Sequence, residues 1–415
     1  MRRQTIAATV FMIPMTFALT NGLSHAQDRT RASALIDQKL REAVERKDVP
    51  GVVALVTDRK GVTYQGVFGV ADVATGRKLA QDSLFRIASM TKPVTSVALM
   101  QLVEQGKLAL EDPVEKYLPE MAKLPVFDSF DAKTGNYHLH LSAKPITVRH
   151  VFTHTSGLGY PFTSATLRDF KPRAGESYPN GPLLFEPGEK WLYGTSTDIV
   201  GRLVEKLSGQ KLEDYFRQHI FAPLGMNDTS YNVPQNKGAR LVAAQQRDGE
   251  RMDGAIVLQP VQPGLTIAQP IGGGGLASTA SDYGRFMRML LNGGELDGKR
   301  VLKAETVALM GQNHIGAVSV PALAVALPRS RDFTFVADGR DKFGLGFLIT
   351  TDHVPGKRSA GSLSWGGINN TYFRVDQSRG IAGVILLQYL PFADPKALAV
   401  HDAFERAAYQ LADAK

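Results

Sequence analysis

Cysteine is absent from this 415-residue chain. The absence excludes disulfide bonds, thiolate metal sites, a cysteine nucleophile and an N-terminal lipid-modified cysteine. A Gly-x-Ser-x-Gly segment is also missing, which argues against an α/β-hydrolase fold. The sequence has no His-Glu-x-x-His segment or comparable cluster of metal ligands. We therefore expect neither a metal nor another cofactor.

Long hydrophobic runs are scarce, and the clearest one lies at the N-terminus. Arg2 and Arg3 precede an apolar segment at 6–19, and a small-x-small cleavage site ends at Ala26. The apolar segment is too short for a membrane span, and no second stretch is long enough. We expect residues 1–26 to be a signal peptide, so that the mature protein is exported, periplasmic or secreted, without an integral membrane segment.

Acidic residues are fewer than basic ones. The formal net charge is +8, and it falls to +6 when Arg2 and Arg3 are removed. The basic residues are scattered and not interleaved with aromatic side chains, which argues against nucleic-acid binding. Hydrophobic residues make up 43% and charged residues 21%, so we expect residues 27–415 to form a globular domain. No feature of the sequence predicts an oligomeric state.

The most informative segment lies at 83–106. After Ser89-Met-Thr-Lys92, mostly apolar residues continue without a helix breaker to Gly106. This pattern predicts a buried helix that ends at a glycine cap. Pro93 is tolerated best in the first turn of a helix, which places the helix start near Ser89. Ser89 and Lys92 then project from the same face, one turn apart.

This spacing suits a serine nucleophile that an amine activates. A helix N-terminus also offers free N–H groups and partial positive charge to an oxyanion near Ser89. Lys92 accepts a proton only when neutral, and its apolar surroundings favour a pKa below the usual value of about 10.4. Ser-x-x-Lys is a weak pattern by itself, because a second copy at Ser208–Lys211 fits a polar helix end with a glycine cap.

The remaining segments predict an α/β fold of the α+β type. Strand patterns gather near both chain ends, at about 30–110 and 340–415, whereas the part at about 111–339 is mainly helical. We therefore expect one antiparallel sheet built from both chain ends and flanked by helices, with an inserted helical region and a cleft where the two meet. The expected strands are 51–57, 62–68, 362–367, 371–375 and 381–387, and the expected flanking helices are 31–46 and 395–412.

Two features of the inserted region need an interpretation. His154 follows a short helix, and hydrogen bonds to turn carbonyls explain it better than a pairing with a serine. The glycine run 272–275 lacks the Gly-Lys-Ser/Thr and the βαβ context of a phosphate loop. We expect a tight turn there, leading into a helix at 281–291 that Ser278 or Ser281 caps. Irregular structure is expected at 120–145, 170–190 and 312–342.

Five motifs follow one another in order along the chain. The motifs are Ser89-Met-Thr-Lys92, Phe-Thr-His-Thr-Ser-Gly-Leu at 152–158, Pro187-Gly-Glu-Lys-Trp-Leu-Tyr193-Gly-Thr-Ser, Gly-Gly-Gly-Leu-Ala-Ser at 273–278 and Trp365-Gly-Gly367. Together they resemble the serine β-lactamase and penicillin-binding-protein superfamily, and they are most similar to the family VIII carboxylesterases, which resemble class C β-lactamases. The resemblance spans roughly residues 35–400 and implies a β-lactamase/transpeptidase-like fold.

The resemblance implies roles for individual residues. Ser89 would be the nucleophile, Lys92 its activating amine, and Tyr193 the group that exchanges a proton with Ser89 Oγ and the leaving group. A free tyrosine has a pKa near 10, so this role needs a nearby cation, which Lys92 offers. The implied oxyanion hole consists of the backbone N–H groups of Ser89 and Ile368.

Two departures from the superfamily pattern bear on the substrate. β-Lactamases have Tyr-x-Asn where this chain has Tyr193-Gly-Thr195, and Lys-Thr-Gly or His-Thr-Gly where it has Trp365-Gly366-Gly367. The missing cation helps to hold a β-lactam carboxylate, whereas an indole offers an apolar wall and one donor. The glycines fit a strand that substrate atoms approach closely. We expect Thr195, Trp365, Gly366 and Gly367 to bind an uncharged small-molecule ester.

The leading hypothesis is an exported serine carboxylesterase that forms an acyl-enzyme on Ser89. One alternative is a β-lactamase or a D-amino-acid peptidase or amidase of the same superfamily. Another is a ligand-binding homologue that acylates without turnover. Acyl transfer to an alcohol or amine is not separable from hydrolysis by sequence.

Overall fold

Two apolar stretches near the N-terminus form the expected hairpin, and strands from the C-terminal part complete the sheet around it. The computed structural model describes residues 17–259, 267–327, 330–332 and 340–414. Its largest sheet has seven strands in the order β11-β12-β13-β14-β15-β1-β2, and every neighbouring pair is antiparallel. The expected antiparallel sheet from both chain ends is confirmed. The strands are β1 (Gly51–Asp58), β2 (Val62–Gly69), β11 (Lys342–Phe343), β12 (Leu348–Ile349), β13 (Leu363–Gly367), β14 (Thr371–Asp376) and β15 (Ile381–Leu386).

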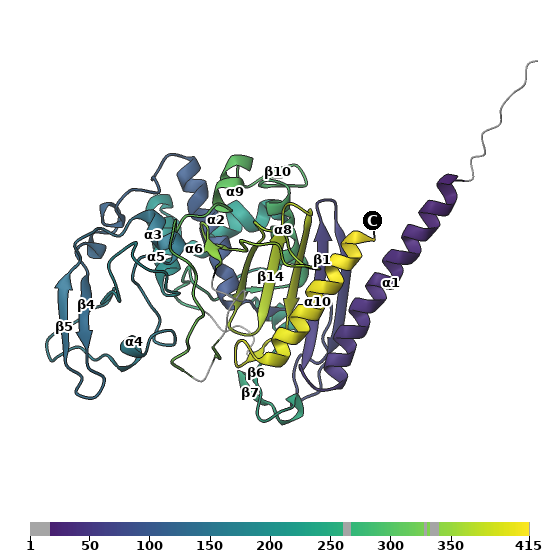
Figure 1. Cartoon of the computed structure of the whole chain (residues 1–415), viewed down its shortest axis with the longest axis horizontal. Helices are drawn as coiled ribbons and strands as arrows, with labels where there is room; N and C mark the ends of the chain where they lie inside the picture. The colour runs from purple at the N-terminus through teal and green to yellow at the C-terminus, as the bar shows by residue number, and fades with distance from the viewer. Residues whose placement is uncertain (1–16, 260–266, 328–329, 333–339, 415) are drawn as a thin grey trace, which may run out of the picture.

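Helices cover both faces of this sheet (Figure 1). Successive side chains of a strand point to opposite faces, and in β1 both sets are buried. Val52 and Ala54 pack in one apolar cluster with α1 (Phe17–Glu45) and α10 (Pro395–Asp413). Val53 and Leu55 pack in the other cluster with α2 (Thr91–Glu104) and α8 (Ala280–Leu291). The sheet therefore forms the middle of three layers.

Helix α2 lies in the interior, as its apolar sequence predicts. Residues 91–102 of the helix are all buried, as expected of a helix that is apolar on every side. A short 3₁₀ turn, η1 (Ala88–Met90), precedes the helix, and Pro93 lies in its first turn. The helix ends at Glu104, and Gly106 follows with φ +69°, a backbone conformation that favours glycine.

Besides the large sheet, the described part of the chain carries short helices and four small sheets. A strand hairpin at 125–141 falls in a stretch for which the sequence predicts no regular structure, whereas residues 170–190 contain neither helix nor strand, as expected. The helices are α3 (Val148–Thr153), α4 (Ala165–Asp169), α5 (Ser196–Ser208), α6 (Leu212–Phe216), α7 (Ala222–Leu224) and α9 (Ala304–Met310). The strands are β3 (Phe85–Arg86), β4 (Pro125–Phe130), β5 (Tyr137–Leu141), β6 (Ala244–Gln246), β7 (Ile256–Gln259), β8 (Ala277–Ser278), β9 (Glu295–Leu296), β10 (Lys299–Arg300) and β16 (Tyr389–Leu390).

One capping residue differs from the expectation. Helix α8 begins after Thr279, whose side chain accepts a hydrogen bond from the backbone N–H of Asp282. The expectation that Ser278 or Ser281 caps this helix is therefore wrong. Ser278 instead lies in β8, and its hydroxyl contacts the hydroxyl of Thr229 at 2.8 Å. A threonine caps a helix about as well as a serine, so sequence alone does not choose among neighbouring hydroxyl residues.

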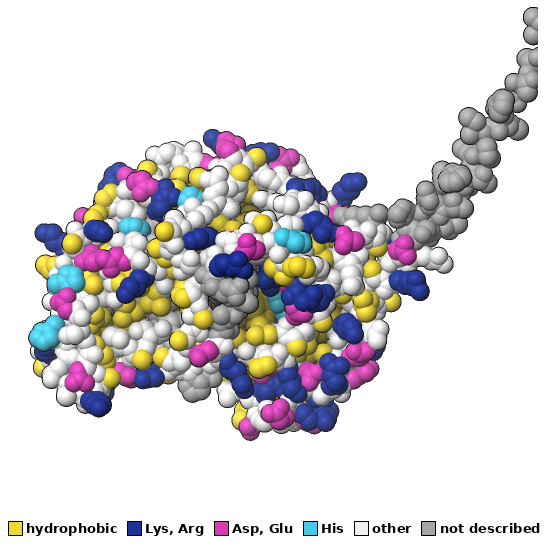
Figure 2. Space-filling model, in the orientation of Figure 1, with side chains coloured by type: hydrophobic (Ala, Val, Ile, Leu, Met, Phe, Trp, Pro, Cys, Tyr) yellow, Lys and Arg dark blue, Asp and Glu magenta, His cyan; other side chains and the backbone are white. Residues whose placement is uncertain are grey.

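The N-terminal part is described only from Phe17 onward. Arg2, Arg3 and most of the expected apolar segment lie outside the described residues, and α1 continues through Ala26. None of the described helices combines the length and the apolar character needed to cross a bilayer. Figure 2 shows lysine and arginine side chains interspersed with aspartate and glutamate over the face in view.

Candidate active site

Ser89 lies in the short 3₁₀ turn at the start of α2, where the sequence places it. Its Oγ accepts a hydrogen bond from the Tyr193 phenol at 2.6 Å and one from Lys92 Nζ at 3.3 Å. The preceding residue, Ala88, has φ +47°, which is uncommon for a residue with a side chain. The structure therefore brings the three expected catalytic side chains together, on a turn with an unusual backbone.

Lys92 is buried directly beneath Ser89. Its ammonium donates to the carbonyl of Gly273 at 2.7 Å and to the Tyr160 phenol at 3.3 Å. Burial lowers the pKa of Lys92, but the nearby Tyr160, Tyr193 and Asp198 outweigh this effect and raise the pKa above its usual value. The expectation of a lowered pKa is wrong, because apolar neighbours in the sequence are not the groups that surround the amine in space. Lys92 is therefore a cation at neutral pH.

Tyr193 is held by aromatic rings and by its backbone. Its ring lies 5.1 Å from the rings of His154 and Trp365 and 5.3 Å from that of Tyr160. Its carbonyl accepts a hydrogen bond from Thr163 Oγ1 at 2.9 Å. A phenol packed in this way keeps one orientation towards Ser89.

His154 supports Tyr193 and does not pair with Ser89. Burial and the charge of Lys92 lower the pKa of His154, so its ring is neutral. Its Nδ1 accepts a long hydrogen bond from the backbone N–H of Gly194 at 3.5 Å. The ring therefore packs among aromatic side chains and accepts from a backbone N–H. The sequence predicts instead that the ring bonds to turn carbonyls, and that prediction is wrong.

The glycine run forms the expected tight turn, and this turn contacts α2. Thr95 Oγ1 donates to the carbonyl of Gly272 at 2.7 Å, and the N–H of Leu276 donates to Thr91 Oγ1 at 3.2 Å. A side chain at Gly272 would collide with the Thr197 carbonyl, since its Cβ would lie 2.2 Å from that oxygen. The turn therefore needs glycine for a close approach of backbones.

Replacing Gly272 by alanine is expected to lower the free energy of unfolding by about 1–3 kcal/mol, the usual cost of overpacking. Gly274→Ala is the matched control, because its Cβ would meet its nearest neighbour, the Ala88 carbonyl, at 3.7 Å. Urea denaturation followed by circular dichroism measures both variants. Equal stability of the two variants would contradict the packing of this turn.

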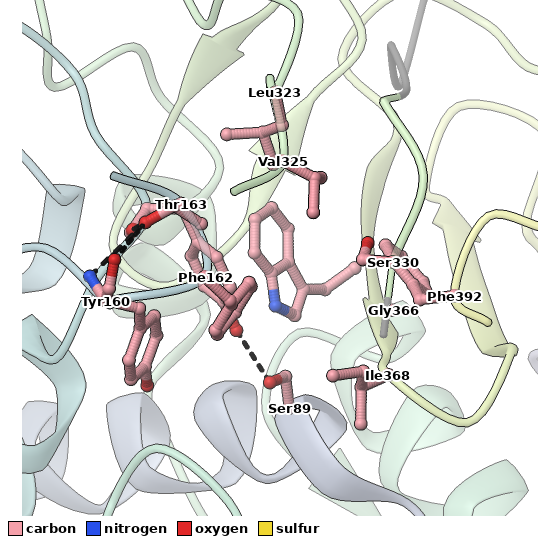
Figure 3. Close-up of a pocket in the computed structure, with 12 residues that line it drawn as sticks. Ser89, Tyr160, Phe162, Thr163, Leu323, Val325, Ser330, Gly366, Ile368 and Phe392 are labelled. Atoms are coloured by element: carbon pink, nitrogen blue, oxygen red, sulfur yellow. Dashed lines mark hydrogen bonds between the residues drawn. The ribbon is translucent and has the colours of Figure 1, made fainter. Parts of the chain in front are cut away.

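A cavity of about 200 Å³ opens above Ser89. In Figure 3, Ile368 lies beside Ser89, whereas Leu323 and Val325 lie on the opposite side of the cavity. Among the residues that the structure describes, the lining contains no lysine, arginine, histidine, aspartate or glutamate. The lining consists of Ser89, Tyr160, Phe162, Thr163, Tyr193, Leu323, Val325, Ser330, Trp365, Gly366, Ile368 and Phe392.

Two backbone contacts hold one wall of this cavity in place. The N–H of Ala326 donates to the carbonyl of Phe162 at 2.8 Å, and the N–H of Arg331 donates to the carbonyl of Phe392 at 3.0 Å. Leu323, Val325 and Ser330 therefore lie next to residues that are hydrogen-bonded to two other parts of the cavity wall, at Phe162 and at Phe392. Sequence patterns gave no sign of these contacts, because the segment has no periodicity.

The expected substrate-binding residues separate into two groups. Trp365 and Gly366 line the cavity above Ser89. Gly367 instead packs against the Ser89 segment, since a Cβ there would lie 2.3 Å from the Ile87 carbonyl. Thr195 lines a different cavity, behind Tyr193. The expected contacts of Gly367 and Thr195 with substrate are thus not supported by their positions.

The two segments that carry the expected oxyanion hole lie next to each other. Ile368 follows directly after β13 and lines the same cavity as Ser89. The close packing of Gly367 on Ile87 brings the end of β13 next to the turn that carries Ser89. Both backbone N–H groups therefore belong to segments that border the space above the Ser89 hydroxyl.

Comparison with known proteins places the chain in a family. The family model described as Beta-lactamase matches residues 36–407. The chain belongs to the beta-lactamase family. Within the part of this beta-lactamase-family protein that the structure describes, no group of three or more histidine, aspartate or glutamate side chains is arranged to hold a metal ion.

Relatives of this beta-lactamase-family chain include acyltransferases and an esterase. It is 30% identical over 405 residues to the monacolin J acid methylbutanoyltransferase of Aspergillus terreus, covering 90% of this chain and 95% of that one. It is 31% identical over 398 residues to the lovastatin esterase of Penicillium rubens, covering 89% and 98%. A mutant simvastatin synthase (LovD) from Aspergillus terreus has a TM-score of 0.77 and 29% identity, covering 93% and 98%. The expected superfamily and fold are confirmed.

Proposed function

We propose that the protein is an exported serine carboxylesterase of the family VIII type, with Ser89 as the nucleophile. The observation that carries the proposal is the 2.6 Å hydrogen bond between Tyr193 and Ser89, next to the buried Lys92 and at a cavity whose described lining contains no acidic or basic side chain. The expected signal peptide at residues 1–26 supports export. The lovastatin esterase relative supports an ester substrate.

The reaction begins with proton transfer from Ser89 Oγ to the phenolate form of Tyr193. Lys92 stabilises that phenolate, because its ammonium lies 4.8 Å from the Tyr193 ring centre. Ser89 Oγ attacks the ester carbonyl, and the N–H groups of Ser89 and Ile368 stabilise the oxyanion by about 3 kcal/mol each. Tyr193 returns the proton to the departing alcohol. Water then repeats these steps on the acyl-enzyme and releases the acid.

The cavity lining supports an uncharged acyl group or alcohol. A carboxylate transferred into an apolar cavity loses its hydration, and the described lining offers it no charged partner. Trp365 lies 5.1 Å from Tyr193, at the place where the β-lactamase pattern has a cation. A β-lactam or a D-amino-acid peptide, each with a carboxylate, is therefore a poorer substrate than a neutral ester.

A matched pair of esters tests this substrate class. We expect kcat/KM for p-nitrophenyl butyrate to exceed that for the p-nitrophenyl monoester of succinic acid by about tenfold or more, the size of one missing charge-assisted hydrogen bond. Nitrocefin completes the panel as a carboxylate-bearing lactam. Faster turnover of nitrocefin than of the neutral ester would favour the β-lactamase alternative. Stoichiometric acylation without turnover would favour a ligand-binding protein.

Acyl transfer to an alcohol is the second candidate function. The methylbutanoyltransferase relative and the apolar cavity, which accommodates an apolar alcohol in place of water, both favour it. Product analysis with an added alcohol separates transfer from hydrolysis. A new ester that accumulates at the expense of the free acid would establish the transferase activity.

A further inference from the structure

Asp198 is linked to the catalytic lysine through a single residue. The backbone N–H of Gly273 donates to Asp198 Oδ1 at 2.7 Å, and the carbonyl of the same glycine accepts a hydrogen bond from Lys92 Nζ at 2.7 Å. A side chain at Gly273 would break this arrangement, because its Cβ would lie 2.5 Å from Asp198 Oδ1. The carboxylate and the ammonium therefore hold opposite sides of one residue.

Asp198 reaches this position from outside the substrate cavity. It lies in the first turn of α5 and lines the second cavity together with Thr195 and Arg202. Segment 158–161 separates the two cavities, since Tyr160 lines the one above Ser89, whereas its neighbours Gly159 and Pro161 line the other. Asp198 is therefore outside the cavity that receives the substrate.

Asp198 differs in charge from the other groups that surround Lys92. Lys92 interacts with Tyr160 and Tyr193, with the neutral His154, and with Asp198. Asp198 in turn interacts with Lys92 and with Tyr231, whose phenol donates to the carbonyl of Ile271 in the same glycine turn. Burial raises the pKa of Asp198, and Lys92 and the Gly273 N–H oppose that change. Among the described groups named as interacting with Lys92, Asp198 is the one carboxylate.

We propose that Asp198 is a positioning residue that fixes the glycine turn against Lys92 and supplies the negative charge that keeps Lys92 an ammonium. It acts through Lys92 and Gly273, since its own position is outside the substrate cavity. The inference rests on the proposed function, because the catalytic pair it supports is Lys92 and Tyr193. Its chemical consequence is a specific pH dependence.

Asp198→Asn tests the charge while keeping an oxygen that accepts from Gly273. A negative charge opposes the loss of a proton from a neighbouring ammonium, so its removal lowers the pKa of Lys92. We expect the pH profile of kcat/KM to move towards lower pH by about one unit or more, with KM unchanged. An unmoved profile, or one moved towards higher pH, would overturn the proposal.

Two further variants separate charge from structure. Asp282→Asn is the matched control, because Asp282 is also a buried carboxylate that accepts a backbone N–H in the first turn of a helix, here from Asp228. The pH profile of kcat/KM of this variant should match that of the wild type. Gly273→Ala displaces the Asp198 carboxylate without altering it chemically, so it should move the profile in the same direction as Asp198→Asn. It also keeps the test decisive if Asp198→Asn fails to fold.

A second readout keeps this inference distinct from the proposed substrate class. The rate at which a fluorophosphonate labels Ser89, followed by intact mass against pH, needs no ester turnover. If the wild type labels but hydrolyses no ester, the proposed function fails, and the labelling profiles still decide the role of Asp198. Unchanged labelling profiles in Asp198→Asn and Gly273→Ala would overturn the inference alone.

Discussion

Replacing Ser89 by alanine is expected to reduce ester hydrolysis by about 10⁴-fold or more, which is the scale seen when a nucleophile of a coupled catalytic group is removed. The reason is the loss of the only oxygen that both Tyr193 and Lys92 reach in the arrangement described above. Steady-state hydrolysis of p-nitrophenyl butyrate measures the loss. Intact mass after fluorophosphonate treatment should show one adduct in the wild type and none in the variant.

Ser96→Ala is the matched control for this substitution. Ser96 is a buried serine of the same helix, and among the described residues its hydroxyl has no hydrogen-bond partner. Removing such a hydroxyl leaves no partner unsatisfied, so stability and turnover should stay close to those of the wild type. Turnover that persists in Ser89→Ala but falls in Ser96→Ala would place the nucleophile elsewhere.

Replacing Tyr193 by phenylalanine is expected to lower kcat by about 10²–10⁴-fold, the usual range for loss of a general acid–base group. The phenyl ring keeps its contacts with His154 and Trp365, so the cavity and KM should change little. Single-turnover kinetics should locate the loss in both acylation and deacylation, because the same phenol serves both steps.

Tyr160→Phe distinguishes the two phenols that meet Lys92. Tyr160 reaches Lys92 at 3.3 Å, whereas Tyr193 also reaches Ser89 Oγ. We expect the Tyr160 variant to lose less than about tenfold in kcat, since one hydrogen bond of ordinary strength is removed. A larger loss in Tyr160→Phe than in Tyr193→Phe would reverse the assignment of the proton-transfer group.

The sequence predicts those parts of the fold and site that depend on local patterns. Two runs rich in β-branched and apolar residues on either side of the turn at 58–61 identify the hairpin of β1 and β2, and an unbroken apolar run identifies α2. Ser89 and Lys92 lie three residues apart, so helix geometry alone brings them together. Tyr193 is predicted to share their site only from the order of several motifs along the chain, because no local pattern relates positions 89 and 193.

Contacts between distant segments account for what the sequence does not predict. The pKa of Lys92 depends on Tyr160 and Asp198, which lie far away in the chain. Thr195 lies two residues after Tyr193, at the start of α5, yet it lines another cavity. Asp198 had no distinctive signal in the sequence, because acidic residues are common in the first turn of a helix, and its partner Gly273 is not readable from sequence.

The pairing of β1 with β15 has a consequence for biosynthesis. Val53 lies opposite Leu386, so the sheet joins a segment made early in translation to one made late. During translation, β1 and β2 are made long before β15, the strand that pairs with β1. Pairing between segments so far apart in the sequence is slow to form. A polypeptide cut before residue 381 would leave an open strand edge, which invites aggregation. Proteolytic clipping there should yield insoluble fragments instead of a smaller working enzyme.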